Sequence, residues 1–190
     1  VVACSEQPTE GSADVTAPLS TVTAGTCNAT LVGNLIKSLF TLKGFLQSAQ
    51  SQFKSIPPKS INPPGTSVRD KVFAFDAFVL NSYYGGFLIG GKSAATQANV
   101  LALINAVNCF AGIPPLTIPP GALGNDGAAA IITPTSPLTT VKTGTGNAGV
   151  QVPTGAVSQP VVVTITRILP DESRPLLTSL DQFPRFYEFH

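Results

Sequence analysis

Apolar residues recur at spacings of three and four along the first half of the chain, which is the pattern of helices with one buried face. The first such run extends from Asn28 to Phe53 and predicts one long helix, which Pro57 and Pro58 end. Its apolar positions are Leu31, Val32, Leu35, Ile36, Leu39, Phe40, Leu42, Phe45, Leu46 and Phe53.

Two further helical patterns follow. The second starts after Thr66, the expected N-cap, and breaks at Gly85, although its β-branched and aromatic residues leave a strand as the alternative. The third begins at Ser93 and closes at Gly112, just before two prolines. Residues 25–112 are therefore predicted to form a unit of three helices.

Short β-rich runs alternate with turn residues in the second half of the chain. In the fourth run, Val161, Val163 and Ile165 alternate with their neighbours at period two, as in an antiparallel sheet. The five runs span residues 130–133, 138–141, 149–152, 161–168 and 183–189. We expect an α+β chain in which residues 113–127 are a Pro/Gly-rich linker and residues 128–190 an antiparallel β domain.

The first 24 residues differ from the rest in charge. They contain three acidic residues and no Lys or Arg, whereas residues 25–69 contain five basic residues and no acid. Within the arm, Val15, Ala17 and Leu19 alternate at period two, as the apolar face of a donated strand would. The alternatives are a disordered leader or an arm folded back on its own subunit.

A turn motif occurs twice, as Ile-Pro-Pro-Gly-Ala-Leu at residues 118–123 and as Val-Pro-Thr-Gly-Ala-Val at residues 152–157. The second copy precedes the run at 161–168. This Pro-x-Gly-Ala turn with its strand resembles immunoglobulin-like sandwiches of secreted bacterial proteins and the related module of ankyrins and netrin receptors. The resemblance covers residues 128–190 and implies about seven strands, of which five are visible.

Three explanations fit the missing strand. The sequence continues beyond residue 190, residues 113–127 supply further strands, or another polypeptide fills the gap. In the third case the chain resembles bacterial pilus subunits, whose incomplete immunoglobulin-like domain accepts a neighbour's arm. That resemblance implies a head-to-tail helical homopolymer. The helical unit departs from the usual pilus subunit.

Three cysteines allow one disulfide and one remaining thiol. Cys27 precedes the first helical pattern and Cys109 ends the last, so a bridge between them would join the two ends of the helical unit. Cys4 is then a candidate for lipid attachment or for a bond to another chain. The alternative is three reduced thiols in a cytosolic protein.

Composition favours an extracellular location. Charged residues make up 11% of the chain, against ~25% in an ordinary soluble domain, and Thr and Ser are abundant. Asn28 begins an Asn-Ala-Thr triplet and is a candidate for glycosylation. No uninterrupted apolar run reaches the ~18 residues of a membrane span, so we expect no transmembrane segment.

Catalytic chemistry finds little support. The only histidine is His190, and Asp70 and Asp76 are six residues apart and expected to be solvated. Residues 86–93 match the phosphate-loop spacing, but their bulky apolar residues favour a glycine hinge in which Ser93 caps a helix. A net charge of +1 argues against nucleic-acid binding. We expect no enzyme, cofactor or metal site.

The sequence therefore predicts a structural subunit of an extracellular bacterial filament. Its arm would complete the immunoglobulin-like domain of another copy. The alternative is a monomeric secreted or lipid-anchored binding module for carbohydrate or protein.

Overall fold

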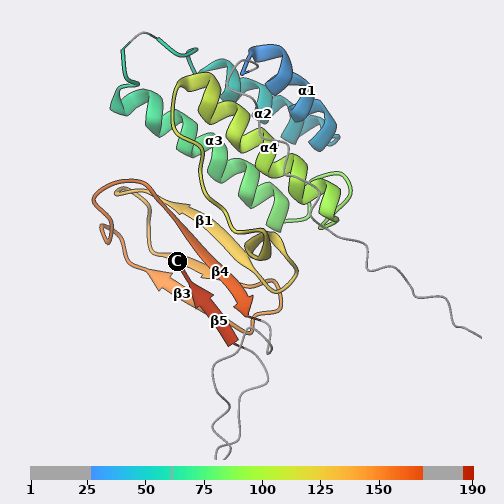
Figure 1. The fold of residues 1–190 in the computed structure, drawn as a ribbon, viewed down its shortest axis with the longest axis vertical. Coiled ribbons are helices and arrows are strands. Elements are labelled where there is room, and N and C mark those ends of the chain that lie inside the picture. Colours follow the sequence, from blue (N-terminus) through green and yellow to red (C-terminus); the bar gives the residue numbers. More distant parts are fainter. Residues whose placement is uncertain (1–26, 61, 169–185) are drawn as a thin grey trace, which may run out of the picture.

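A computed structural model describes residues 27–60, 62–168 and 186–190 (Figure 1). The chain is of the α+β class, as the sequence predicts, with helices preceding antiparallel strands. The helices are α1 (Ala29–Leu39), α2 (Lys43–Lys54), α3 (Thr66–Tyr84), α4 (Ala94–Ala111) and the short 3-10 helix η1 (Pro120–Leu123). The strands are β1 (Ala128–Ile132), β2 (Thr139–Lys142), β3 (Gly149–Val152), β4 (Val161–Ile168) and β5 (Phe186–Phe189).

The prediction of one long first helix, and hence of a three-helix unit, is wrong. Helix α1 ends at Phe40, whose backbone is extended at φ −110° and ψ 112°, and α2 starts three residues later. The Phe40 side chain is buried, and its ring stacks on Phe78 of α3 at 5.7 Å between centroids. The apolar residues at positions 39, 40, 42, 45 and 46 are too closely spaced to lie on one face of a single helix. Because the helix breaks at Phe40, α1 and α2 can each bury their own apolar face.

The second and third helical patterns are helices in the structure, and the strand alternative for the second is wrong. Gly65, rather than Thr66, is the N-cap residue of α3, and Thr66 is its first helical residue. Ser93 caps α4 by accepting a hydrogen bond from the Thr96 N–H at 3.2 Å. Gly112 ends α4 in the left-handed conformation, with φ 75°, where a residue with a side chain would be strained.

The strands form two antiparallel sheets (Figure 1). The first has the order β1-β4-β5, and the second pairs β2 with β3. The register pairs Ala128 with Ile165 and Ala129 with Thr164. Because neighbouring residues of a strand face opposite sides of the sheet, the three-stranded sheet has one face toward the helices and one toward the β2–β3 hairpin.

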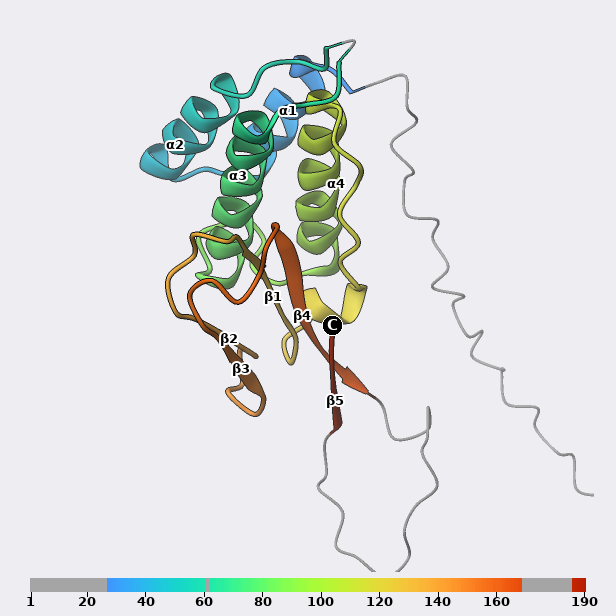
Figure 2. The ribbon, with the colours of Figure 1, turned by 90° about the vertical axis from the view of Figure 1, so that its left-hand side faces the viewer.

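Each face of that sheet has its own apolar cluster. Ala129 and Ile131 belong to the large cluster formed with the helices. Ala128, Ile132 and Ile165 form a second cluster with Val141 of β2. In Figure 2 the helices lie above the strands, and the β2–β3 hairpin lies to one side of β1 and β4.

Residues 113–127, predicted as a linker, contribute buried side chains to the helical cluster, namely Ile113, Ile118, Ala122 and Leu123. The segment contains η1 and no strand. The segment therefore does not supply the further strands that one of the three sequence-based explanations expects of it.

Two adjacent tyrosines join α3 to this segment. Tyr83 Oη donates to the carbonyl of Leu123, and Tyr84 Oη donates to the carbonyl of Ala122 at 2.8 Å. Burial raises the pKa of both hydroxyls above the usual value for tyrosine, so they stay protonated and can donate. This pair couples the helices to the sheet.

Among the described residues, one helix, α4, has the length and composition of a membrane span, and half of it is buried inside the structure.

Candidate functional site

The outer edge of β5 is a candidate assembly site. Thr164 and His190 exchange two backbone hydrogen bonds, at 2.8 and 3.1 Å. In an antiparallel ladder such pairs alternate with pairs that exchange none. The register Ile165 with Phe189 and Arg167 with Tyr187 therefore turns the backbone N–H and C=O groups of Tyr187 and Phe189 away from β4.

No strand of the described residues pairs with this edge, because β5 ends the order β1-β4-β5. Strand β1, at the opposite edge, has four of its five side chains buried. At β5, by contrast, Glu188 and Phe189 are exposed, and Phe189 keeps 51% of its surface accessible. An open edge beside an exposed phenylalanine is a surface on which another strand can add.

Side chains of β5 extend the apolar face of the sheet. Tyr187 packs against the cluster that contains Ala128, Val141 and Ile165. Phe189 lies two residues along the same strand and therefore on the same face as Tyr187. A strand added beside β5 would thus meet backbone hydrogen-bonding groups at its edge and an apolar surface on this face.

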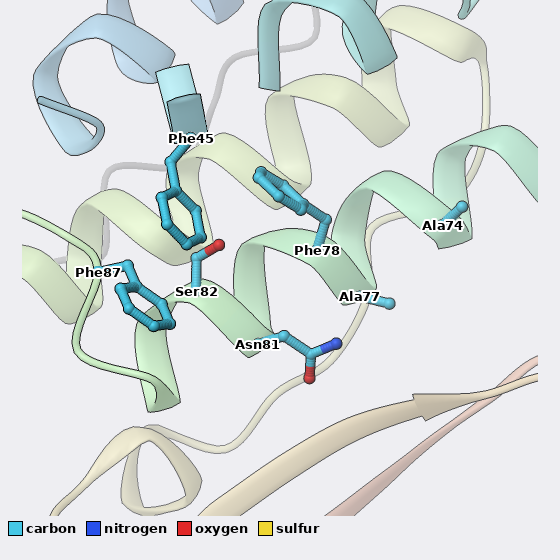
Figure 3. Close-up of a pocket in the computed structure, with 7 residues that line it drawn as sticks. All are labelled: Phe45, Ala74, Ala77, Phe78, Asn81, Ser82 and Phe87. Carbon is cyan, nitrogen blue, oxygen red and sulfur yellow. The ribbon is translucent and has the colours of Figure 1, made fainter. Parts of the chain in front are cut away.

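A second candidate site is an aromatic groove between α2, α3 and the loop that follows α3 (Figure 3). The rings of Phe45 and Phe87 stack at 4.4 Å between centroids, and Phe45 also stacks on Phe78 at 6.2 Å. The groove has a volume of about 290 Å³. It is lined by Phe45, Ala74, Ala77, Phe78, Asn81, Ser82 and Phe87.

The groove lies in an apolar part of the surface. Phe87 and Ile89 are each 42% exposed, and Leu42, in the turn between α1 and α2, is 51% exposed. The Ile89 N–H donates to the carbonyl of Leu39 at 3.0 Å, which holds the loop against the end of α1. Sequence reasoning missed this groove; the signal available to it was a phenylalanine placed between turn glycines at positions 86 and 90.

The two cysteines predicted to pair lie together. Cys27 and Cys109 form a disulfide with 5.7 Å between their Cα atoms and 82 residues between them in sequence. It joins the start of the helical unit to the last turn of α4. The other predicted site residues of the arm, Cys4, Val15, Ala17 and Leu19, lie outside the described residues.

Asn28, the candidate for glycosylation, has a structural role as well. Its side-chain Oδ1 accepts a hydrogen bond from the Leu31 N–H at 2.9 Å, so Asn28 is the N-cap of α1. The residue is exposed. Glycosylation takes place on the other side-chain atom, Nδ2, so the cap leaves the acceptor function of Asn28 open.

The segment with phosphate-loop spacing follows a helix, α3, rather than a strand. Gly86, Gly90 and Gly91 all have positive φ, and Ser93 Oγ lies 2.9 Å from Thr96 Oγ1. These features belong to a glycine-rich turn between two helices whose last residue is a helix cap. The structure thus agrees with the glycine-hinge interpretation.

One carboxyl that the sequence predicts to be solvated is buried in the structure. Asp76 is fully buried on α3, beside Asn108 of α4, whereas Asp70 is exposed. Burial raises the pKa of Asp76 well above its usual value, and the hydrogen bond from Asn108 lowers it by less. The prediction failed because Asp76 occupies a position in the buried stripe of its helix.

The remaining chemistry concerns metal-binding residues and the single histidine. Within the described ranges, no three Cys, His, Asp or Glu residues lie close enough to hold a metal ion. His190 Nε2 lies 3.0 Å from Glu188 Oε2, and both side chains are about half exposed.

Comparisons with protein-family models, with curated proteins and with solved structures found no match.

Proposed function

We propose that this chain is a structural subunit of an extracellular bacterial filament. In this proposal the β strands form an incomplete immunoglobulin-like sandwich, and the N-terminal arm of another copy adds beside β5. The observation that carries the proposal is the open edge of β5, with the backbone groups of Tyr187 and Phe189 directed outward. Strand addition of this kind obtains affinity from main-chain hydrogen bonds and specificity from alternate side chains.

The arm has properties that suit this edge. One face of an extended arm would carry Val15, Ala17 and Leu19. These side chains would cover the apolar surface beside β5, which includes the exposed Phe189. The basic residues of positions 25–69 are all exposed, so the acidic arm would be attracted to a neighbouring copy. A head-to-tail contact that does not close generates a helical filament.

The proposal is tested by negative-stain electron microscopy of the full chain and of two matched variants. Phe189→Lys places a charge on the open edge, where charge opposes strand addition. Leu138→Lys places the same charge on another exposed apolar residue, which lies in the loop before β2 and is 61% exposed. We expect filaments from the unmodified chain and from Leu138→Lys, but none from Phe189→Lys.

The donor is tested separately. Replacing Val15, Ala17 and Leu19 with Asp keeps the length of the arm and removes its apolar face. Subunits with this arm should not polymerise. A synthetic peptide of residues 13–22 should bind such subunits and protect the amides of Tyr187 and Phe189 from hydrogen exchange. Dispersed particles from the unmodified chain, or filaments that persist in the Phe189→Lys variant, would contradict the proposal.

The aromatic groove favours a second candidate function, a monomeric binding module for carbohydrate. Exposed aromatic rings such as Phe87 offer an apolar surface to the C–H groups of a sugar, and the exposed Asn81 carboxamide beside them can donate and accept hydrogen bonds. This function predicts NMR shift changes at Asn81 and Phe87 on titration with glycans, and loss of the change at Phe87 in Asn81→Ala. Binding without filaments would favour it over the filament proposal.

A further inference from the structure

Asp76 of α3 and Asn108 of α4 meet where the two helices pack together. The buried residues of α3 recur at helical spacing, and those of α4 follow the same rule. In α3 they include Val72, Phe75, Asp76, Val79, Leu80 and Tyr83, and in α4 Val100, Leu103, Ile104, Val107, Asn108 and Ala111. Asp76 and Asn108 each occupy a buried position within these stripes that an apolar side chain would otherwise fill. Both residues have no accessible surface.

Asp76 and Asn108 share a hydrogen bond, but one oxygen of each side chain accepts none from the described residues. Asn108 Nδ2 donates to Asp76 Oδ2 at 2.7 Å and to the carbonyl of Ile104 at 2.8 Å, which uses both of its hydrogens. The two remaining oxygens, Asp76 Oδ1 and Asn108 Oδ1, are buried and have no hydrogen-bond partner among the residues that the structure describes. Two unpaired acceptors therefore remain on two side chains that are already joined, and each such group is costly to bury.

Asp76 forms no ion pair with any cation of the described residues. It is the only charged residue among the buried polar residues that the structure describes. Helix α4 and strand β1, which pack on α3, contain no titratable side chain except Cys109, which is in the disulfide. Helix α2 carries Lys43 and Lys54 at its two ends, both exposed. Tyr83 lies further along α3 and donates its hydroxyl hydrogen to Leu123.

An ionised carboxylate in this environment would keep one buried oxygen without a partner and one charge without a counter-ion. A single proton on Oδ1 removes both problems, because a neutral acid has an O–H donor and Asn108 Oδ1, on the side chain already bonded to Asp76, lacks one. Burial acts in the same direction, since it raises the pKa of Asp76 well above its usual value.

We propose that Asp76 is a neutral carboxylic acid at neutral pH, and that its Oδ1–H donates to Asn108 Oδ1 to close a two-bond ring between α3 and α4. Raising the pH transfers the proton to water and opens the second bond of this ring. The pair is therefore a pH-sensitive link between α3 and α4, the two longest helices that the structure describes. It does not depend on the filament proposal.

The direction of the pH dependence follows from proton linkage. In the unfolded chain an aspartate titrates near ~3.9, whereas in the folded chain Asp76 keeps its proton to higher pH. Between these two pKa values the folded state binds one proton more than the unfolded state. The folding equilibrium constant therefore decreases about tenfold for each unit that the pH rises in this window, and the contribution is fully present below the unfolded pKa.

The decisive variant is Asp76→Asn. An asparagine retains the shape and can donate from Nδ2 to Asn108 Oδ1 while it accepts from Asn108 Nδ2, but it does not titrate. Urea unfolding is measured between pH 4 and pH 9 for the full chain, for Asp76→Asn and for the control Asp70→Asn, whose carboxyl is exposed on the same helix. The folding constant of the full chain divided by that of Asp76→Asn should decrease as the pH rises. The folding constant of the full chain divided by that of Asp70→Asn should not show this decrease.

A second measurement uses only the unmodified chain, so it does not depend on whether a variant folds. Infrared difference spectra of the full chain, labelled with ¹³C at the aspartate carboxyls, should contain the band of one protonated carboxylic acid at pH 7. A spectrum with carboxylate bands alone at pH 7 would overturn the proposal. So would a ratio of folding constants between the full chain and Asp76→Asn that does not change with pH.

Discussion

Tyr84 Oη donates a hydrogen bond of 2.8 Å to the carbonyl oxygen of Ala122, 38 residues further along the chain. The contact joins the last turn of α3 to η1, next to the bond that Tyr83 makes to Leu123. Because only the short turn at residues 124–127 separates η1 from β1, the two tyrosine hydroxyls connect the helical part of the chain to the sheet.

Tyr84→Phe should lower the free energy of unfolding by about 1–2 kcal/mol, because it leaves the Ala122 carbonyl without this donor. Tyr187→Phe is the matched control, since the Tyr187 hydroxyl is buried and has no hydrogen-bond partner among the described residues, so its removal should be neutral or stabilising. Urea unfolding of both variants checks the prediction. Equal effects of the two changes would contradict the role assigned to Tyr84.

The disulfide should contribute strongly to stability, because it closes a long loop in the unfolded chain. Replacing Cys27 and Cys109 together with Ala should lower the free energy of unfolding by about 2–5 kcal/mol. The control is Cys4→Ala, which should change it little. A titration that finds three free thiols in the native protein would show that the bridge is absent.

Asn28 allows its cap role to be separated from glycosylation. In protein made without glycosylation, Asn28→Ala should cost about 1 kcal/mol through loss of the bond to the Leu31 N–H. Thr30→Ala destroys the acceptor triplet but leaves the cap, so it should have little effect on stability. If the residue is modified in a glycosylating host, mass spectrometry should find the sugar lost from both variants.

Gly127 lies where the chain passes close to η1. A Cβ at this position would overlap the backbone carbonyl oxygens of Gly121 and Ala122, so Gly127→Ala should destabilise the fold by about 1–3 kcal/mol. The control Gly33→Ala lies within α1, where nothing is within 4 Å of an added Cβ. It should instead stabilise the protein by about 0.5–1 kcal/mol. A thermal unfolding series distinguishes the two signs.

Several elements could be predicted from sequence because their signals are local. The sequence predicts Ser93 and Gly112 as the start and end of α4, and both have these roles in the structure. The fourth β-rich run matches β4, Val161–Ile168. Caps and turns depend on hydrogen bonds and backbone angles within a few residues, so the residues themselves carry the information.

The candidate sites were predicted less well. Cys27 and Cys109 were paired from their positions at the two ends of the helical unit, but the groove at Phe45 and Phe87 was missed. Its rings come from segments that are 42 residues apart, and no local pattern indicates that they meet. The sequence predicts a solvated Asp76 because a charged side chain is rarely buried, but that rule does not account for the place of Asp76 in the buried stripe of α3.

The sequence by itself determined the α+β class, the period-two strand of β4 and the residues that start and stop α4, because short-range sterics and hydrogen bonding decide these features. Only the tertiary structure decided that α1 ends at Phe40, that residues 113–127 pack into the core, that Asp76 meets Asn108, and that β5 lies at the edge of its sheet. These features depend on which apolar faces meet, and burial is a property of surfaces brought together from distant parts of the chain.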